Sequence, residues 1–267
     1  IVPTGLTYSP YNDDSSCKTA DQVYADLQII ASKGISQIRI YGTDCNVFNT
    51  VAPAAKKLGL TIMQGLYITA AGIDSIDDGL SGFMSYAAVN DPSYSQFDSL
   101  TIGNEAVTNG WVTAEQLIEK TKQIRAKLAA VGFNKPIFTA EPPSAYIEHP
   151  ELCSTTSPFD RIGLNVHPYF DQYSSADQSY EFLASQDAAV NAACSGSAPH
   201  LIVETGYPHA GDVYGLQVPS VQNQRISVKQ ILEYTAGNVV LFTMYDDFWK
   251  APGPHNVETY FGLIDLL

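Results

Sequence analysis

The chain has 267 residues, and its 28 acidic side chains outnumber its 14 basic ones, which gives a formal net charge of −14 at pH 7. Such a chain repels the phosphates of nucleic acid and anionic membrane surfaces, so we expect neither as a partner. A hydrophobic content of 45% supports a sizeable core, and a charged content of only 16% excludes a disordered or coiled-coil chain. No apolar run approaches the roughly 18 residues that a membrane-spanning helix needs.

Eight short apolar runs, rich in β-branched residues, recur along the chain and predict β-strands. Helical patterns fill most of the gaps between them. The predicted strands are Pro3–Tyr8, Ile35–Tyr41, Leu60–Tyr67, Ser99–Gly103, Pro136–Ala140, Arg161–Val166, Leu201–Glu204 and Val239–Tyr245.

Several of the intervening helices have recognisable starts. Thr19, Thr113 and Ser220 are each placed to cap an amphipathic segment. Apolar residues recur near the helical period after Thr113, at Leu117, Ile118, Ile124 and Leu128. The predicted helices with the clearest patterns are Val112–Val131, Asp177–Ala193 and Val221–Tyr234.

Eight apolar strands linked by helices fit a closed parallel barrel better than an open sheet. The length alone leaves one large barrel and two smaller domains both open. Because no linker rich in Pro, Gly or Ser and no low-complexity block interrupts the pattern, we predict a single (β/α)₈ barrel over residues 1–267.

The four cysteines allow three pairings, and none of them has the close spacing of a zinc or redox motif. In a barrel, Cys17 and Cys45 both follow early strands on the same rim, which favours Cys17 with Cys45 and Cys153 with Cys194. Disulfides imply an oxidising compartment. The first residues, Ile1 to Gly5, have the pattern of a strand rather than a cleavable leader, so we expect a mature, processed chain.

In barrel enzymes the chemistry lies where the strands end, and carboxylates end the predicted fourth and seventh strands. These carboxylates, Glu105 and Glu204, face each other across the barrel mouth. Retaining cleavage of a glycosidic bond needs such a pair about 5 to 5.5 Å apart. A helix cap, a salt bridge or a solvated loop would explain either residue taken singly, but not the pair together with neighbouring polar and aromatic groups.

The two carboxylates need different surroundings to share this chemistry. The acid, Glu105, needs a pKa raised by burial or by a nearby negative charge, whereas the nucleophile, Glu204, must stay ionised. We expect Asn104 to bond a sugar hydroxyl and Tyr169 to donate a hydrogen bond to Glu204. The other polar groups expected to contact substrate are Tyr8, Tyr41 and Asn165.

Further side chains near the strand ends are candidates for holding a sugar. Trp249, Phe261 and Tyr207 are candidates for stacking on glucose rings, although core packing competes as an explanation. Glu141 is a candidate for binding a sugar hydroxyl, for tuning Glu105 by like-charge repulsion, or for a structural ion pair with Arg39. The five histidines have no metal-binding spacing, and we expect neither metal nor cofactor.

Five motifs in order along the chain resemble those of glycoside hydrolase family 17, in its fungal cell-wall branch. They are Arg39-Ile40-Tyr41, Ile102-Gly103-Asn104-Glu105, Asn165-Val166-His167-Pro168-Tyr169-Phe170, Val203-Glu204-Thr205-Gly206-Tyr207-Pro208 and Tyr260-Phe261-Gly262-Leu263. The resemblance implies action on β-1,3-glucan with retention, with Glu105 as acid/base and Glu204 as nucleophile. It also implies contacts from Asp247, Lys250 and Glu258, while His167 stands where plant members commonly have Tyr.

The sequence leaves several functions open. Hydrolysis and glucanosyl transfer share every step up to the glycosyl-enzyme, and they differ in whether water or a glucan hydroxyl attacks it. A catalytically idle glucan-binding wall protein and a retaining glycosidase of another linkage specificity are the alternatives. We expect a monomer, secreted or in the cell wall, whose partner is a β-glucan.

Overall fold

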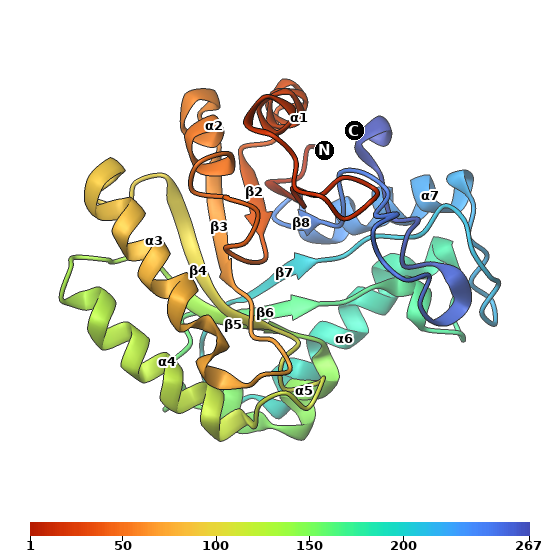
Figure 1. Cartoon of the computed structure of the whole chain (residues 1–267). Coiled ribbons are helices and arrows are strands. Elements are labelled where there is room, and N and C mark those ends of the chain that lie inside the picture. Colours follow the sequence, from red (N-terminus) through yellow and green to blue (C-terminus); the bar gives the residue numbers. More distant parts are fainter.

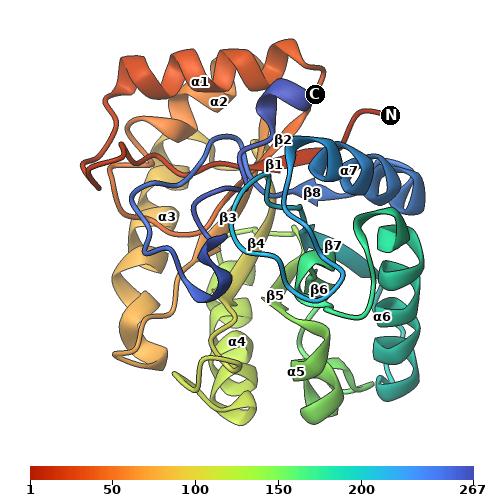
Figure 2. The same ribbon diagram turned by 90° about the vertical axis from the view of Figure 1, so that its right-hand side faces the viewer.

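The computed structural model describes residues 1–267 and contains eight parallel strands ringed by helices (Figure 1, Figure 2). The strands are β1 (Gly5–Thr7), β2 (Gln37–Ile40), β3 (Thr61–Leu66), β4 (Phe97–Asn104), β5 (Ile137–Glu141), β6 (Ile162–Asn165), β7 (His200–Glu204) and β8 (Val240–Leu241). They pair in the order β7-β6-β5-β4-β3-β2-β1-β8. A parallel bridge between Thr205 and Leu241 joins the two ends of this order. The predicted (β/α)₈ barrel is therefore confirmed.

The helices pack around the outside of the ring, as Figure 2 shows. They are α1 (Ala20–Ser32), α2 (Val51–Leu58), α3 (Asp77–Asn90), α4 (Ala114–Ala129), α5 (Pro143–Glu148), α6 (Ser179–Ala193) and α7 (Val221–Thr235). Thr19 and Thr113 cap α1 and α4 through capping boxes, and the Ser220 side chain caps α7. Each satisfies backbone N–H groups that the first helical turn leaves without partners, as predicted.

The structure departs from the prediction around β8, which has two residues in place of the predicted Val239–Tyr245. Beyond Leu241 the backbone bonds irregularly, because Phe242 N–H donates to the carbonyl of Thr205 and Met244 N–H to that of Thr7. No α-helix follows. The C-terminal segment instead ends in a 3₁₀ turn between α1 and α7 (Figure 2), where the Lys33 ammonium donates to the Leu267 carbonyl.

Two apolar clusters fill the molecule. The larger contains 56 buried residues from the strands and the inner faces of the helices. The smaller lies at the mouth of the barrel and consists of Tyr169, Ala176, Tyr207, Phe242, Val257 and Phe261. Burying these aromatic rings stabilises the loops after β6, β7 and β8, which form one side of the mouth.

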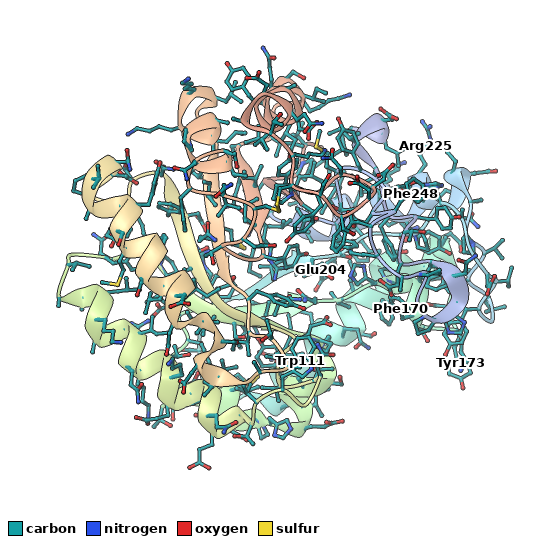
Figure 3. The ribbon with its side chains drawn as sticks, viewed as in Figure 1. Trp111, Phe170, Tyr173, Glu204, Arg225 and Phe248 are labelled. Carbon is teal, nitrogen blue, oxygen red and sulfur yellow. A yellow bond between two sulfur atoms is a disulfide. The ribbon has the colours of Figure 1, made fainter.

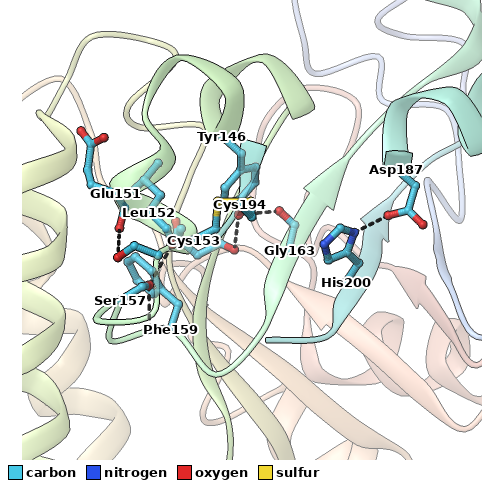
Figure 4. The surroundings of a disulfide bond; sticks show 12 residues. Tyr146, Glu151, Leu152, Cys153, Ser157, Phe159, Gly163, Asp187, Cys194 and His200 are labelled. Atoms are coloured by element: carbon cyan, nitrogen blue, oxygen red, sulfur yellow. Dashed lines mark hydrogen bonds and ion pairs between the residues drawn. A yellow bond between two sulfur atoms is a disulfide. The ribbon is translucent and has the colours of Figure 1, made fainter. Parts of the chain in front are cut away.

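Both disulfides have the pairing favoured from the sequence. Cys17–Cys45 joins the loops that follow β1 and β2. Cys153–Cys194 joins a 3₁₀ turn after α5 to the end of α6 (Figure 4). No helix in the structure is both long and apolar enough to cross a bilayer.

Candidate active site

A cleft of about 720 Å³ opens at the C-terminal ends of the strands. It brings together residues whose chain positions are far apart, and Figure 3 shows Glu204 near the middle of the barrel mouth. The predicted site residues that line it are Tyr41, Asn104, Glu105, Glu204, Trp249, Lys250, Glu258 and Phe261. The two carboxylates therefore share one cleft, as predicted from their positions at the ends of the fourth and seventh strands.

Glu204, the last residue of β7, is 9% exposed and is held at both carboxylate oxygens. The Tyr41 hydroxyl donates to its Oε2 at 2.5 Å, and His167 Nε2 lies 3.0 Å from its Oε1. Burial raises the pKa of Glu204. The contacts with His167, Arg39 and Tyr41 outweigh burial and lower that pKa to about 2, so the carboxylate is ionised at neutral pH.

Arg39 is completely buried beneath the two carboxylates and connects the strands that carry them. Its Nη1 lies 3.5 Å from Glu204 Oε2 and donates to the Val203 carbonyl at 2.9 Å. Its Nη2 donates to Asn104 Oδ1 at 2.8 Å. One guanidinium therefore supplies positive charge to the nucleophile and fixes the residue next to the acid.

Glu105 follows β4 and has a backbone φ of +54°, which is uncommon outside glycine. The amide of Asn165 donates to its Oε1 at 3.2 Å. Burial, followed by the negative charge of Glu204, raises the pKa of Glu105 to about 7, against a weaker opposing effect of Asn165. Near neutral pH the cleft can thus hold one carboxylic acid and one carboxylate.

Residues 5–262 match the BtgE/BtgC glycoside hydrolase domain. The chain belongs to this family. The probable β-glucosidase btgE of Aspergillus fumigatus is 32% identical over 262 residues, which cover 98% of this chain and 45% of that protein. The probable family 17 glucosidase SCW10 of Saccharomyces cerevisiae is 34% identical over 260 residues, which cover 97% and 64% respectively.

A solved structure supports the same assignment. The glycoside hydrolase family 17 β-1,3-glucanosyltransferase from Rhizomucor miehei has a TM-score of 0.80 and 25% identity, covering 99% of this chain and 94% of that one. The resemblance to the fungal side of family 17 is therefore confirmed. The chain spans about half the length of the btgE relatives it matches.

Several family-motif residues lie outside the cleft. Tyr169 is buried and donates to the Asp212 carbonyl at 2.7 Å, so its predicted bond to Glu204 is wrong. Tyr41 makes that bond instead. In a strand, Tyr169 and His167 would share a face, but the chain turns into a 3₁₀ helix at Pro168 and the alternation is lost.

Other predicted contact residues are also placed away from the cleft. Tyr207 is buried and bonds Gln217, and Tyr8 bonds Asp26 beside a second cavity of about 990 Å³. Asn165 is buried and acts on Asn104 and Glu105 rather than facing open space.

Glu141 is completely buried and bonds the backbone after Glu105. The predictions of a sugar contact and of an ion pair with Arg39 are therefore both wrong for Glu141. Its side chain lies between β5 and the loop after β4, outside the lining of the cleft.

One side of the cleft carries both charged and aromatic side chains. The Trp249 indole N–H donates to Asp247 Oδ1 at 3.1 Å, and Asp247 also pairs with Lys250 at 2.9 Å. Asp247 is 5% exposed, so it holds its two neighbours rather than facing substrate itself. Trp249 packs edge-on against Tyr11 at 4.7 Å.

Sequence reasoning missed several cleft residues. The roles of Arg39 and His167 were hidden, although Arg39 and Tyr41 stand two positions apart at the end of β2, which places both side chains on one face. Tyr11 and Tyr67 line the cleft from loops, and Phe170 lines it from the 3₁₀ helix after β6. Loop residues have no periodicity from which their direction could be predicted.

Proposed function

We propose that the chain is a retaining enzyme acting on β-1,3-glucan, with Glu105 as acid and then base and Glu204 as nucleophile. The observation that carries the proposal is the opposite ionisation of two carboxylates in one cleft. Burial and the charge of Glu204 raise the pKa of Glu105, while His167, Arg39 and Tyr41 keep Glu204 ionised. A retaining double displacement requires this pairing.

The residues perform the two halves of the reaction in sequence. Glu204 attacks the anomeric carbon as Glu105 gives its proton to the glycosidic oxygen, so the bond to the leaving group breaks and a glycosyl ester forms. The ester removes the negative charge of Glu204, and the pKa of Glu105 falls. Glu105 then takes a proton from the attacking hydroxyl, which displaces Glu204 and restores both groups.

Asn104 is placed to orient the sugar beside the reacting carbon. Its Oδ1 accepts hydrogen bonds from Arg39 and from Asn165, each at 2.8 Å. This leaves its amide N–H groups as the donors that can face a sugar hydroxyl. Trp249 offers an aromatic face for a glucose ring on the same side of the cleft as Lys250.

The substrate class rests on the family and on the chemistry of the cleft. The Rhizomucor miehei relative is named a β-1,3-glucanosyltransferase, and the yeast relative a family 17 glucosidase. A neutral glucan is compatible with a net charge of −14, which does not repel it. We infer that water and glucan hydroxyls compete for the glycosyl-enzyme. Because disulfides persist in oxidising compartments, the two disulfides indicate that the enzyme acts outside the reducing cytoplasm.

A time course with laminari-oligosaccharides of defined length tests the proposal. We expect products with the substrate's β-configuration, shorter ones from hydrolysis and longer ones wherever transfer occurs. Glu204→Gln should abolish turnover while leaving oligosaccharide binding. Binding without turnover by the wild-type protein would favour the idle wall protein, and cleavage confined to β-1,4- or β-1,6-glucans in a linkage panel would overturn the substrate.

A further inference from the structure

Glu141, the last residue of β5, is a fully buried carboxylate with no contact to the cleft. Its Oε1 accepts a hydrogen bond from the Val107 N–H at 2.8 Å. Its Oε2 accepts from the Thr108 hydroxyl at 2.7 Å and from the Thr108 N–H at 3.3 Å. Burial raises the pKa of Glu141, and its three partners oppose this effect, because all of them are donors and an ionised carboxylate only accepts.

The two residues bound by Glu141 belong to the turn that directly follows Glu105. Glu105 has a φ of +54°, a left-handed conformation that is strained for a residue with a side chain. Such a conformation persists only where its surroundings hold it. Here β5 holds it twice, because the Glu105 N–H donates to the Ala140 carbonyl at 2.8 Å and Glu141 binds the turn.

We propose that Glu141 is a positioning residue for the acid/base: its carboxylate fixes the turn that aims Glu105 into the cleft, and it places a buried negative charge close to that turn. This inference rests on the role proposed above for Glu105. Glu141 does not touch substrate. It acts through the backbone of Val107 and Thr108 and through the field that it creates at Glu105.

The charged and titratable groups around Glu105 come from several strands. Glu204 faces it from β7, His167 from the end of β6, Tyr67 from the end of β3 and Glu141 from β5. Burial and then Glu204 raise the pKa of Glu105, and Glu141 adds in the same direction, while Asn165 and His167 oppose them.

The negative charge of Glu141 is present in both halves of the reaction. The negative charge of Glu204 disappears when its ester forms, but that of Glu141 remains. The remaining charge keeps Glu105 a stronger base for activating the attacking hydroxyl. Glu141 should therefore influence both halves of the reaction.

Two substitutions separate the charge of Glu141 from its position. Glu141→Gln keeps the length of the side chain and one acceptor oxygen but removes the charge. Glu141→Asp keeps the charge but withdraws the carboxylate from the turn by one methylene. The titration of Glu105 is followed in the free enzyme by carbon NMR of labelled glutamate, with the signal assigned by Glu105→Gln.

We expect the titration midpoint of Glu105 to move to lower pH in E141Q, and the basic limb of kcat/KM to move with it. In E141D the midpoint should stay near its wild-type position, while kcat falls roughly tenfold to a hundredfold with little change in KM, because the acid is misplaced. An unchanged midpoint in E141Q together with wild-type kcat in E141D would overturn the proposal.

Thr108 provides a second test if the Glu141 variants do not fold, because its side chain is exposed and its replacement spares the core. Thr108→Val removes one of the three donors and should lower kcat severalfold, whereas Thr108→Ser should rescue it. Wild-type kcat in T108V would count against a positioning role. The NMR titration uses no substrate, so a failure on β-1,3-glucan would refute the proposed function without deciding this inference.

Discussion

The two glutamates of the cleft are the same residue type, and their neighbours alone make them different. Glu204 is surrounded by donors, from Tyr41, His167 and Arg39, which favour its ionised form despite burial. The Glu105 carboxylate accepts a hydrogen bond from Asn165 and faces negative charge. A hydrogen bond to a charged group contributes about 1.5–3 kcal/mol, so single donors matter here.

Tyr41→Phe tests this account at the level of one residue. Removing the donor to Glu204 should raise the pKa of Glu204, so the acidic limb of kcat/KM should move to higher pH. The value of kcat/KM should fall roughly 10- to 100-fold. The matched control is Tyr169→Phe, whose hydroxyl bonds Asp212 instead; it should cost about 1 kcal/mol of unfolding free energy. An acidic limb that moves in Y169F but not in Y41F would reverse our assignment.

At this scale the sequence predicts the carboxylates and not their partners. Glu105 and Glu204 end strands, and strand ends converge in a barrel whatever the loops do. Tyr41 and Tyr169 both lie near strand ends in family motifs, and no pattern in the sequence distinguishes their directions. The 3₁₀ turn at Pro168 decides between them.

Among the elements, the end of β4 combines a left-handed backbone with close packing. Gly103 has a φ of +76°, and a Cβ at this position would lie 2.8 Å from Ile68 Cδ1. Gly59, after α2, has a similar φ of +70°, but a Cβ there would meet nothing within 4 Å. The two glycines thus share one conformation and differ in packing.

Substituting each glycine separates strain from crowding. Gly59→Ala should lower the free energy of unfolding by about 1 kcal/mol, from backbone strain alone. Gly103→Ala should cost about 2–4 kcal/mol, because Ile68 must move as well, and it should reduce kcat by displacing Glu105. Urea unfolding and kinetics check both variants. Equal losses in the two variants, with kcat intact, would show that β4 tolerates the change.

The elements themselves follow closely from the sequence, because alternation, helical period and caps are local signals. The helix predicted at Val221–Tyr234, for instance, is Val221–Thr235 in the structure. The short β8 and the absence of an α-helix after it could not be predicted from the sequence. Both depend on backbone hydrogen bonds from Phe242 and Met244 to Thr205 and Thr7, which are far away in the sequence. Such bonds leave no local pattern in the sequence.

For the whole molecule, the two active-site glutamates contribute to folding stability with opposite dependence on pH. The folded-state pKa of Glu105 is raised from 4.5 to about 7, so its protonated form favours folding below about pH 4.5, and this contribution is lost as pH rises through 7. Glu204 has the opposite sign. Its pKa of about 2 gives a contribution that is present above about pH 4.5 and lost as pH falls toward 2.

Neutral variants of the two glutamates should therefore change stability in opposite directions at pH 8. Glu105→Gln should be more stable than the wild type by up to about 3 kcal/mol at pH 8 and about equally stable at pH 4. Glu204→Gln should be less stable than the wild type at pH 8. Urea unfolding at the two pH values measures both differences. Destabilisation of E105Q at pH 8 would mean that the folded protein does not disfavour the ionised form of Glu105.

The disulfide pairing was predictable only through the whole fold. Four cysteines allow three pairings, and only the barrel places the loops of Cys17 and Cys45 on one rim. The topology of the barrel therefore predicts the cysteine pairing, whereas the spacing of the cysteines in the sequence does not. The same topology brings β4 and β7 to one cleft, which connects the architecture to the chemistry.

The most direct test of the central claim is to trap the glycosyl-enzyme. A laminari-oligosaccharide carrying fluorine at C2 and a good leaving group at C1 slows breakdown of the ester, so intact-protein mass spectrometry should show one added glycosyl group. Peptide mapping should place it on Glu204, and Glu204→Gln should remain unlabelled. No adduct on a protein that turns over laminarin, or an adduct on another residue, would contradict the account.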